Sequence, residues 1–122
     1  IEPGGTALLL VESFRPGVTR VPIRPDGSAG APSPVVTPAP GVIPDGTAFG
    51  PDGMPYTGCC EPSQVSRADL ATGKVSTVLA DPTAHLLCHP TDVAFRGGEL
   101  FTANLGRWHI TVIEDLDLDT GR

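Results

Sequence analysis

Asp45 is the residue of this chain whose type and setting best suit it to chemistry. It stands in the string Pro44-Asp45-Gly46, shortly before the apolar pair Ala48-Phe49. A carboxylate at the mouth of a narrow channel offers a hard oxygen to Ca²⁺, Mg²⁺, Mn²⁺ or Zn²⁺, and such a cation can polarise a carbonyl group and acidify water. Pro-Asp-Gly is also a strong β-turn sequence in which the Asp side chain bonds the backbone. The residues alone leave both interpretations of Asp45 open.

A second group of candidates surrounds the later string Pro90-Thr91-Asp92-Val93-Ala94-Phe95, which aligns with the Asp45 segment on Ala-Phe. In this alignment Asp92 is offset from Asp45 by one position. We expect Asp92, Asn104 and His89 to line a substrate pocket, because functional groups of stacked sheets gather where the loops enter the innermost strands. Asn104 also ends a predicted strand, where it could cap a turn instead.

Other polar and aromatic residues near these positions favour structural roles. His85 and Cys88 share a loop with His89, and this loop either lines the pocket or closes the sheet; a metal site there is the weaker interpretation. Trp108 and His109 enter a predicted middle strand. We expect them to pack between sheets, with the imidazole bonded to the backbone, and not to act in catalysis.

The elements that must position these residues repeat along the chain. Three glycine turns, opened by Gly5, Gly53 and Gly98, lie 48 and then 45 positions apart. Each turn leads into a strand pair whose second member holds an apolar anchor 12 or 13 positions later; these anchors are Val18, Val65 and Ile110. A repeat of roughly 40 to 50 residues with several short strands is typical of a β-propeller blade, because one small sheet cannot bury its faces alone.

The sequence therefore predicts an all-β fold, a β-propeller of four-stranded antiparallel blades, with two to three blades present. We expect blade-like repeats near 1–40, 41–88 and 89–122, with no internal domain boundary. The expected strands lie near 6–12, 17–23, 34–37, 46–50, 54–59, 63–69, 74–79, 91–96, 99–104 and 108–114. The chain opens at Ile1 without an initiator Met and stops at a turn signal, so we interpret it as an internal segment of a longer protein.

Composition and charge narrow the possible partners. The 122 residues include 15 glycines and 14 prolines, which disfavours long helices, while 39% hydrophobic residues is too apolar for a disordered chain. A net charge of −6 leaves no basic face for nucleic acid or an anionic membrane. The acidic group Glu114, Asp115, Asp117 and Asp119 lacks the glycine and closing glutamate of an EF-hand, so we expect a solvated edge.

The three cysteines do not have the spacing of a zinc site. Cys59 and Cys60 are adjacent and Cys88 is distant, so no disulfide framework is evident. An odd count of this kind favours a cytoplasmic location, with a periplasmic or secreted one left open by the start of the chain. We expect Cys59 and Cys60 to be small buried apolar residues of an inner strand.

Several motifs, taken in order, resemble the regucalcin/gluconolactonase/senescence-marker-protein family over essentially the whole chain. They are Pro44-Asp45-Gly46-Thr47-Ala48-Phe49, Asp52-Gly53, Gln64-Val65-Ser66-Arg67-Ala68-Asp69, Thr72-Gly73-Lys74-Val75, Pro90-Thr91-Asp92-Val93-Ala94-Phe95 and Ala103-Asn104-Leu105-Gly106-Arg107-Trp108-His109-Ile110. The resemblance implies a six-bladed propeller whose axial site holds a divalent cation and hydrolyses lactones of sugars or related molecules.

The same resemblance implies that Asp45 is a metal ligand and a possible general base. The family's other ligands are a glutamate and an asparagine of earlier blades, and the repeat arithmetic puts their counterparts before Ile1. We therefore expect an incomplete metal site here and an inactive isolated segment. Its partners would be the lactone substrate and either the remaining blades or another copy, through open blade edges.

Two further classes remain open beside the lactonase. A non-catalytic propeller could bind a small molecule or a protein on the same face, because fold does not decide function. The related strictosidine-synthase-like propellers would need no catalytic metal.

Overall fold

The computed structural model describes residues 1–114 and 116, and within them it holds ten strands and no helix. The all-β prediction is confirmed. The strands are β1 (Ala7–Glu12), β2 (Gly17–Pro22), β3 (Ser33–Val36), β4 (Ile43–Phe49), β5 (Pro55–Glu61), β6 (Gln64–Ala68), β7 (Val75–Ala80), β8 (Pro90–Arg96), β9 (Glu99–Asn104) and β10 (Ile110–Ile113). The acidic positions 115, 117 and 119 lie outside the described residues. No described segment forms a helix long and apolar enough to cross a membrane.

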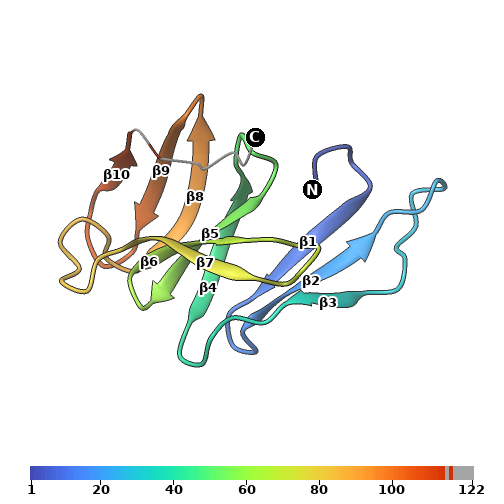
Figure 1. Cartoon of the computed structure of the whole chain (residues 1–122), viewed down its shortest axis with the longest axis horizontal. Coiled ribbons are helices and arrows are strands. Elements are labelled where there is room, and N and C mark those ends of the chain that lie inside the picture. Colours follow the sequence, from blue (N-terminus) through green and yellow to red (C-terminus); the bar gives the residue numbers. More distant parts are fainter. Residues whose placement is uncertain (115, 117–122) are drawn as a thin grey trace.

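The strands form three antiparallel sheets that follow one another along the chain. The first sheet has the order β1-β2-β3, the middle sheet β4-β5-β6-β7 and the third sheet β8-β9-β10. Figure 1 shows them side by side, each connected to the next by a segment from the outermost strand of one sheet to the innermost strand of its successor. This is the arrangement of propeller blades.

We predicted four strands in each blade. Within the described residues, only the middle sheet has four, and the first and third sheets have three each. β1 follows a glycine turn, as β5 and β9 do, so it corresponds to the second strand of the middle sheet. The first sheet accordingly has no described strand on the inner side of β1, and the third ends at β10, where the described strands end.

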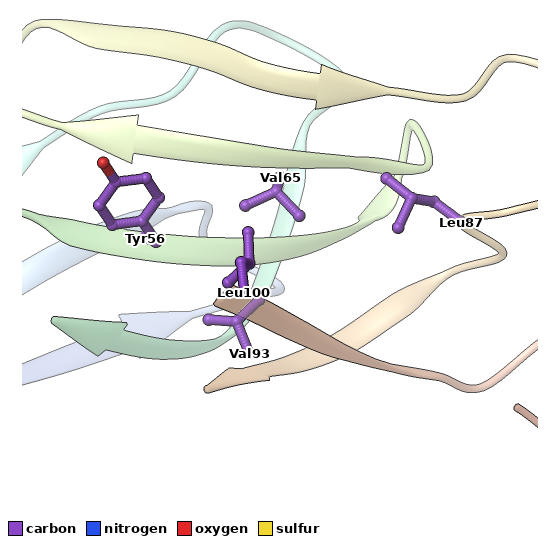
Figure 2. Packing of buried hydrophobic residues seen from close by; sticks show 5 residues of the cluster. All are labelled: Tyr56, Val65, Leu87, Val93 and Leu100. Carbon is purple, nitrogen blue, oxygen red and sulfur yellow. The ribbon is translucent and has the colours of Figure 1, made fainter. Parts of the chain in front are cut away.

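Two apolar clusters fill the spaces between the sheets. The cluster between the middle and third sheets contains Tyr56 and Val65 from one side and Val93 and Leu100 from the other, with Leu87 from the connecting segment. Figure 2 shows Val65 above Leu100 and Leu100 above Val93. Between the first and middle sheets, the buried residues are Val18, Val36 and Ala68.

A polar network fixes the middle sheet at the end where β4 turns into β5. The Asp52 carboxylate accepts hydrogen bonds from the Tyr56 hydroxyl at 2.9 Å, the Arg67 Nε at 2.7 Å and the Met54 backbone N–H at 3.1 Å. Burial raises the pKa of Asp52, but these donors outweigh it and hold that pKa below its ordinary value. Burial and the neighbouring carboxylate together raise the pKa of Tyr56 to about 12.

Candidate functional site

The innermost strands β4 and β8 lie side by side and run in the same direction, and β4 also contacts β1 (Figure 1). Both carry an irregularity near their first residues. Pro44 of β4 pairs with Cys59 of β5, and the next paired residue, Thr47, pairs with Thr57. Three steps along β4 thus match two steps along β5, so β4 contains one extra residue. In β8 the pairing with β9 shifts between Pro90 and Asp92.

These β-bulges occupy the two positions that the sequence alignment matches, Asp45 and Thr91. A bulge turns a side chain out of the regular alternation and is common beside functional sites. Asp45 thus lies within a bulged strand and not in a β-turn, although Pro-Asp-Gly is a turn sequence. Its side chain is half-buried.

The closest described partner of the Asp45 carboxylate is a thiol. Cys60, on the neighbouring strand β5, donates its S–H to Asp45 Oδ2 at a distance of 3.4 Å. The same sulfur lies 3.9 Å from the carbonyl oxygen of Pro90, at the start of β8. Burial and the carboxylate of Asp45 raise the pKa of the Cys60 thiol to about 11, so it is a protonated donor at neutral pH.

Sequence reasoning missed this role for Cys60. Cys59 is buried, only 1% exposed, as expected for both cysteines, but Cys60 is half-buried and faces the inner strands. Successive residues of a strand point to opposite sides of the sheet. The alternation along residues 55–61 was the available signal, because it requires the two adjacent cysteines to face different neighbours.

Asp92 lies against the backbone of β4 beside Asp45. A Cβ atom built on Gly46 would come within 2.7 Å of Asp92 Cγ and 2.6 Å of the Thr91 carbonyl oxygen. Only glycine allows β8 to approach β4 this closely. The Asp92 carboxylate accepts the Val93 backbone N–H at 2.9 Å and the residue is otherwise exposed, which leaves its side chain accessible at this end of the strands.

His89 connects the start of β8 to the β5–β6 turn. Its backbone has a φ of 51°, in the left-handed region, and its N–H donates to Ser63 Oγ at 3.1 Å. The ring Nδ1 lies 2.8 Å from the Cys60 carbonyl oxygen and 3.2 Å from Glu61 Oε1. The hydrogen bond to the carbonyl places the proton on Nδ1 in the neutral ring and leaves Nε2 as the acceptor.

Asn104 is buried and fully engaged in internal hydrogen bonds. Its Oδ1 accepts the Cys88 N–H at 3.1 Å, and its Nδ2 donates to Thr111 Oγ1 at 3.0 Å and to the His109 carbonyl at 3.3 Å. These contacts tie the loop before β8 to the β9–β10 hairpin. The pocket role expected for Asn104 stays a prediction, and the geometry shows the capping role that the sequence left open.

The remaining candidate residues either help to close the loop before β8 or lie in solvent. His85 is exposed, whereas Cys88 is buried and its carbonyl accepts the Gly106 N–H at 3.0 Å. His109 Nε2 donates to the Leu86 carbonyl at 3.1 Å, which confirms its expected bond to the backbone. The expected packing between sheets is wrong for both Trp108 and His109, because the turn between β9 and β10 projects Trp108 wholly into solvent and leaves His109 exposed as well.

Two carboxylates, the half-buried Asp45 and the exposed Asp92, are the main candidate ligands at this end of the inner strands. Asp45 and Asp92 lie on adjacent inner strands, and Glu61 follows at the end of β5, which makes this end of the sheets attractive to cations. Within residues 1–114 and 116, no three His, Cys, Asp or Glu side chains come close enough together to hold a metal ion.

Comparison with known proteins shows the fold. No family model and no curated protein matches the chain. The solved structures that are similar to it include the following three. The nidogen/laminin complex has a TM-score of 0.73 at 21% identity over 88% of this chain and 40% of that one. The luciferin-regenerating enzyme has a TM-score of 0.70 at 20% identity, over 98% of this chain and 39% of that one. Virginiamycin B lyase from Staphylococcus aureus has a TM-score of 0.66 at 20% identity, over 87% of this chain and 33% of that one.

These neighbours are propeller-type proteins, which confirms the predicted propeller architecture. The chain spans between 33% and 40% of their lengths. At such identities the similarity extends to the fold alone, and the two enzymes and the binding complex among them differ in activity.

Proposed function

We propose that this chain forms part of the axial site of a propeller hydrolase that opens lactones of sugars or related small molecules with the help of a divalent cation. The observation that carries the proposal is the half-buried Asp45 carboxylate at the bulge of β4, the strand that lies beside the innermost strand of the next sheet. The order of motifs that resembles the regucalcin family supports the same reaction class.

The residues present fit a cation in part. Asp45 offers carboxylate oxygens, of which Oδ2 is bonded only to a weak thiol donor. Asp92 adds a second accessible carboxylate on the adjacent strand. A complete cation site needs ligands from beyond the described residues. When bound, the cation would polarise the lactone carbonyl and acidify a water molecule.

The chain's own side chains have separate tasks in this proposal. Asp45 would be a ligand of the cation and is the candidate base for the proton of the attacking water. His89, fixed through Nδ1, would present Nε2 as a hydrogen-bond acceptor for a substrate hydroxyl, and the exposed Asp92 carboxylate would be a second acceptor. Asn104 fixes the loop that carries His89 and contacts no substrate in this scheme.

The test measures hydrolysis of a panel of aldonolactones by the protein that carries this sequence, with and without a chelator. Asp45→Asn should abolish cation-dependent turnover, whereas Asp26→Asn should not change it, because Asp26 lies in an exposed turn and bonds only Ser28. The rise of the melting temperature with added Ca²⁺, Mn²⁺ or Zn²⁺ provides a readout independent of turnover. Hydrolysis that survives both chelation and Asp45→Asn would refute the proposal.

The second candidate is a propeller that binds a ligand or a protein without catalysis or, like the strictosidine-synthase type, reacts without a metal. It is favoured by one observation, the lack of three converging ligand side chains within residues 1–114 and 116. In the same experiments it predicts no lactone turnover and no change of melting temperature with any cation.

A further inference from the structure

The apolar cluster between the first and middle sheets leaves a crevice beside the segment 37–42, which connects β3 to β4 (Figure 1). The outer part of this crevice has a volume of about 380 Å³ and is lined by the connecting segment and by β6 and β7. A deeper part of about 30 Å³ lies between the sheets and shares four lining residues with the outer part, namely Pro38, Val42, Ser66 and Val75. The outer volume lies in the range of ligand-binding pockets.

Both walls of this crevice lie within the described chain. The described residues that line it come from β2 to β7 and from the segments between these strands, and none comes from β1 or from the third sheet. The strand that the first sheet lacks belongs on the inner side of β1, whereas β3, at the other edge of that sheet, adjoins the crevice. Further strands beyond the first or the third sheet would therefore replace neither wall.

The deeper part of the crevice is apolar and the outer part carries neutral polar groups. Val18, Val36 and the Cys59 thiol line the deeper part, and burial raises the pKa of that thiol, so it is uncharged at neutral pH. Gln64 and Ser66 line the outer part, although they are only 8% and 6% exposed. None of the described residues that line either part is charged. The crevice is therefore suited to an uncharged ligand.

The polar groups of the crevice have hydrogen-bonding capacity left for such a ligand. Gln64 Nε2 donates to Ser66 Oγ at 3.0 Å, and this hydroxyl lies 3.6 Å from the Cys59 sulfur. Among the described residues, Gln64 Oε1 accepts no hydrogen bond, yet no fully buried side-chain oxygen or nitrogen lacks a partner, so this oxygen reaches the open part of the crevice. A largely buried amide with an unused acceptor favours a ligand that donates a hydrogen bond to it.

We propose that this crevice binds a small uncharged molecule that has a short aliphatic group and a hydrogen-bond donor, as in an aliphatic amide or alcohol. The aliphatic group would occupy the deeper part, where about 30 Å³ leaves room for roughly two groups of methyl size, and the donor would meet Gln64 Oε1. Water is a poor occupant of the deeper part because the lining there is apolar. A charged ligand would lose hydration without gaining a partner of opposite charge.

The experiment titrates isobutyramide into the isotope-labelled protein that carries this sequence and follows its amide signals by NMR. We expect the side-chain amide of Gln64 and the backbone amides of Ser66 and Val75 to shift, with a Kd of about 1 to 10 mM, as is usual for a very small ligand. Two related molecules are compared with it. Isobutyrate is the charged isostere and acetamide lacks the branched aliphatic group, so each should bind at least about fivefold more weakly.

Two variants and a matched control locate the binding. Gln64→Leu keeps the size of the side chain and removes its amide, and Val42→Phe fills the crevice from the connecting segment. Each should weaken isobutyramide binding by about fivefold or more. Ser76→Val is the control and should leave binding unchanged, because Ser76 lies on β7 between the crevice residues Val75 and Thr77 and points to the opposite face of the sheet.

Circular dichroism melting checks that the variants stay folded, and the comparison of the three small molecules uses the wild-type protein, so it decides even where a variant unfolds. The proposal is overturned if the wild-type protein does not bind isobutyramide or binds isobutyrate and acetamide as tightly. Binding that is unchanged in both folded crevice variants would overturn it as well. None of these outcomes depends on lactone turnover, so the crevice and the Asp45 proposal fail separately.

Discussion

Replacing Gly46 with alanine perturbs the closest approach between the two innermost strands. The added methyl group would meet the Thr91 carbonyl oxygen at 2.6 Å and the Asp92 carboxyl carbon at 2.7 Å. Ordinary contacts of a Cβ atom lie beyond about 3.4 Å, so β8 must retreat by several tenths of an ångström from β4. Asp92 has a short side chain that can rotate away, but the Thr91 carbonyl belongs to the strand and cannot.

The expected cost follows from this geometry. Overpacking of a rigid contact destabilises a fold by roughly 1 to 3 kcal/mol, and we expect about 2 kcal/mol here. For a chain of this size that corresponds to a fall of about 6 to 10 °C in melting temperature. The assay is thermal and urea unfolding followed by circular dichroism.

Gly98→Ala is the matched control, because a Cβ atom there meets nothing within 4 Å and its φ lies outside the left-handed region. We expect its melting temperature to stay within about 2 °C of the wild type. Combining Gly46→Ala with Asp92→Ala should restore only part of the loss, since the carbonyl contact remains. If Gly46→Ala melts together with Gly98→Ala, the inner strands are not packed as closely as described and the reasoning is refuted.

Two more changes test the networks at the two ends of the middle sheet. Asp52→Asn removes a charge that accepts hydrogen bonds from Tyr56 and Arg67, and its cost in urea unfolding should be about 1 to 2 kcal/mol at pH 7. The pKa of Asp52 is lowered in the fold, so the stabilisation by its charge is present above the ordinary pKa of 3.8 and is lost as the pH falls through the lower folded value. If the free-energy cost of Asp52→Asn stays constant down to pH 2, the network is contradicted. At the other end, Asp45→Asn removes the charge that helps raise the pKa of Cys60. The rate of Cys60 alkylation at pH 8, measured by peptide mass spectrometry, should therefore rise about three- to tenfold. An unchanged rate would show that burial alone protects the thiol.

The fold was largely accessible from the sequence because its signals are local. Glycine turns and apolar alternation mark the start and facing of a strand within a few residues, and all ten expected strands are present. The largest boundary error concerns β4, expected near 46–50 but found at Ile43–Phe49. Pro44 and Gly46 argue against a regular strand, yet a bulge on an innermost strand accommodates both.

The site was less accessible because its contacts join distant strands. Asp45 could be singled out from its string, but the thiol that bonds it belongs to a strand 15 positions later, and that contact depends on the pairing of β4 with β5. The exposure of Trp108 was missed for a similar reason. An aromatic residue beside a strand predicts burial, whereas the direction in which a turn projects is set by the sheet that carries it.

The contiguity of each sheet in the chain has a kinetic consequence. Every hydrogen-bonded strand pair joins neighbours in sequence, so hairpins close over short loops and each sheet forms without a distant partner. Long-range closure is needed for the stacking of one sheet on the next, which includes the contacts of β8 with β4 and β5 and of β1 with β4. Nucleation can therefore begin in any sheet and spread to the next, as in other repeat proteins. We expect the middle sheet, which has an apolar cluster on each face, to open last during native-state fluctuations.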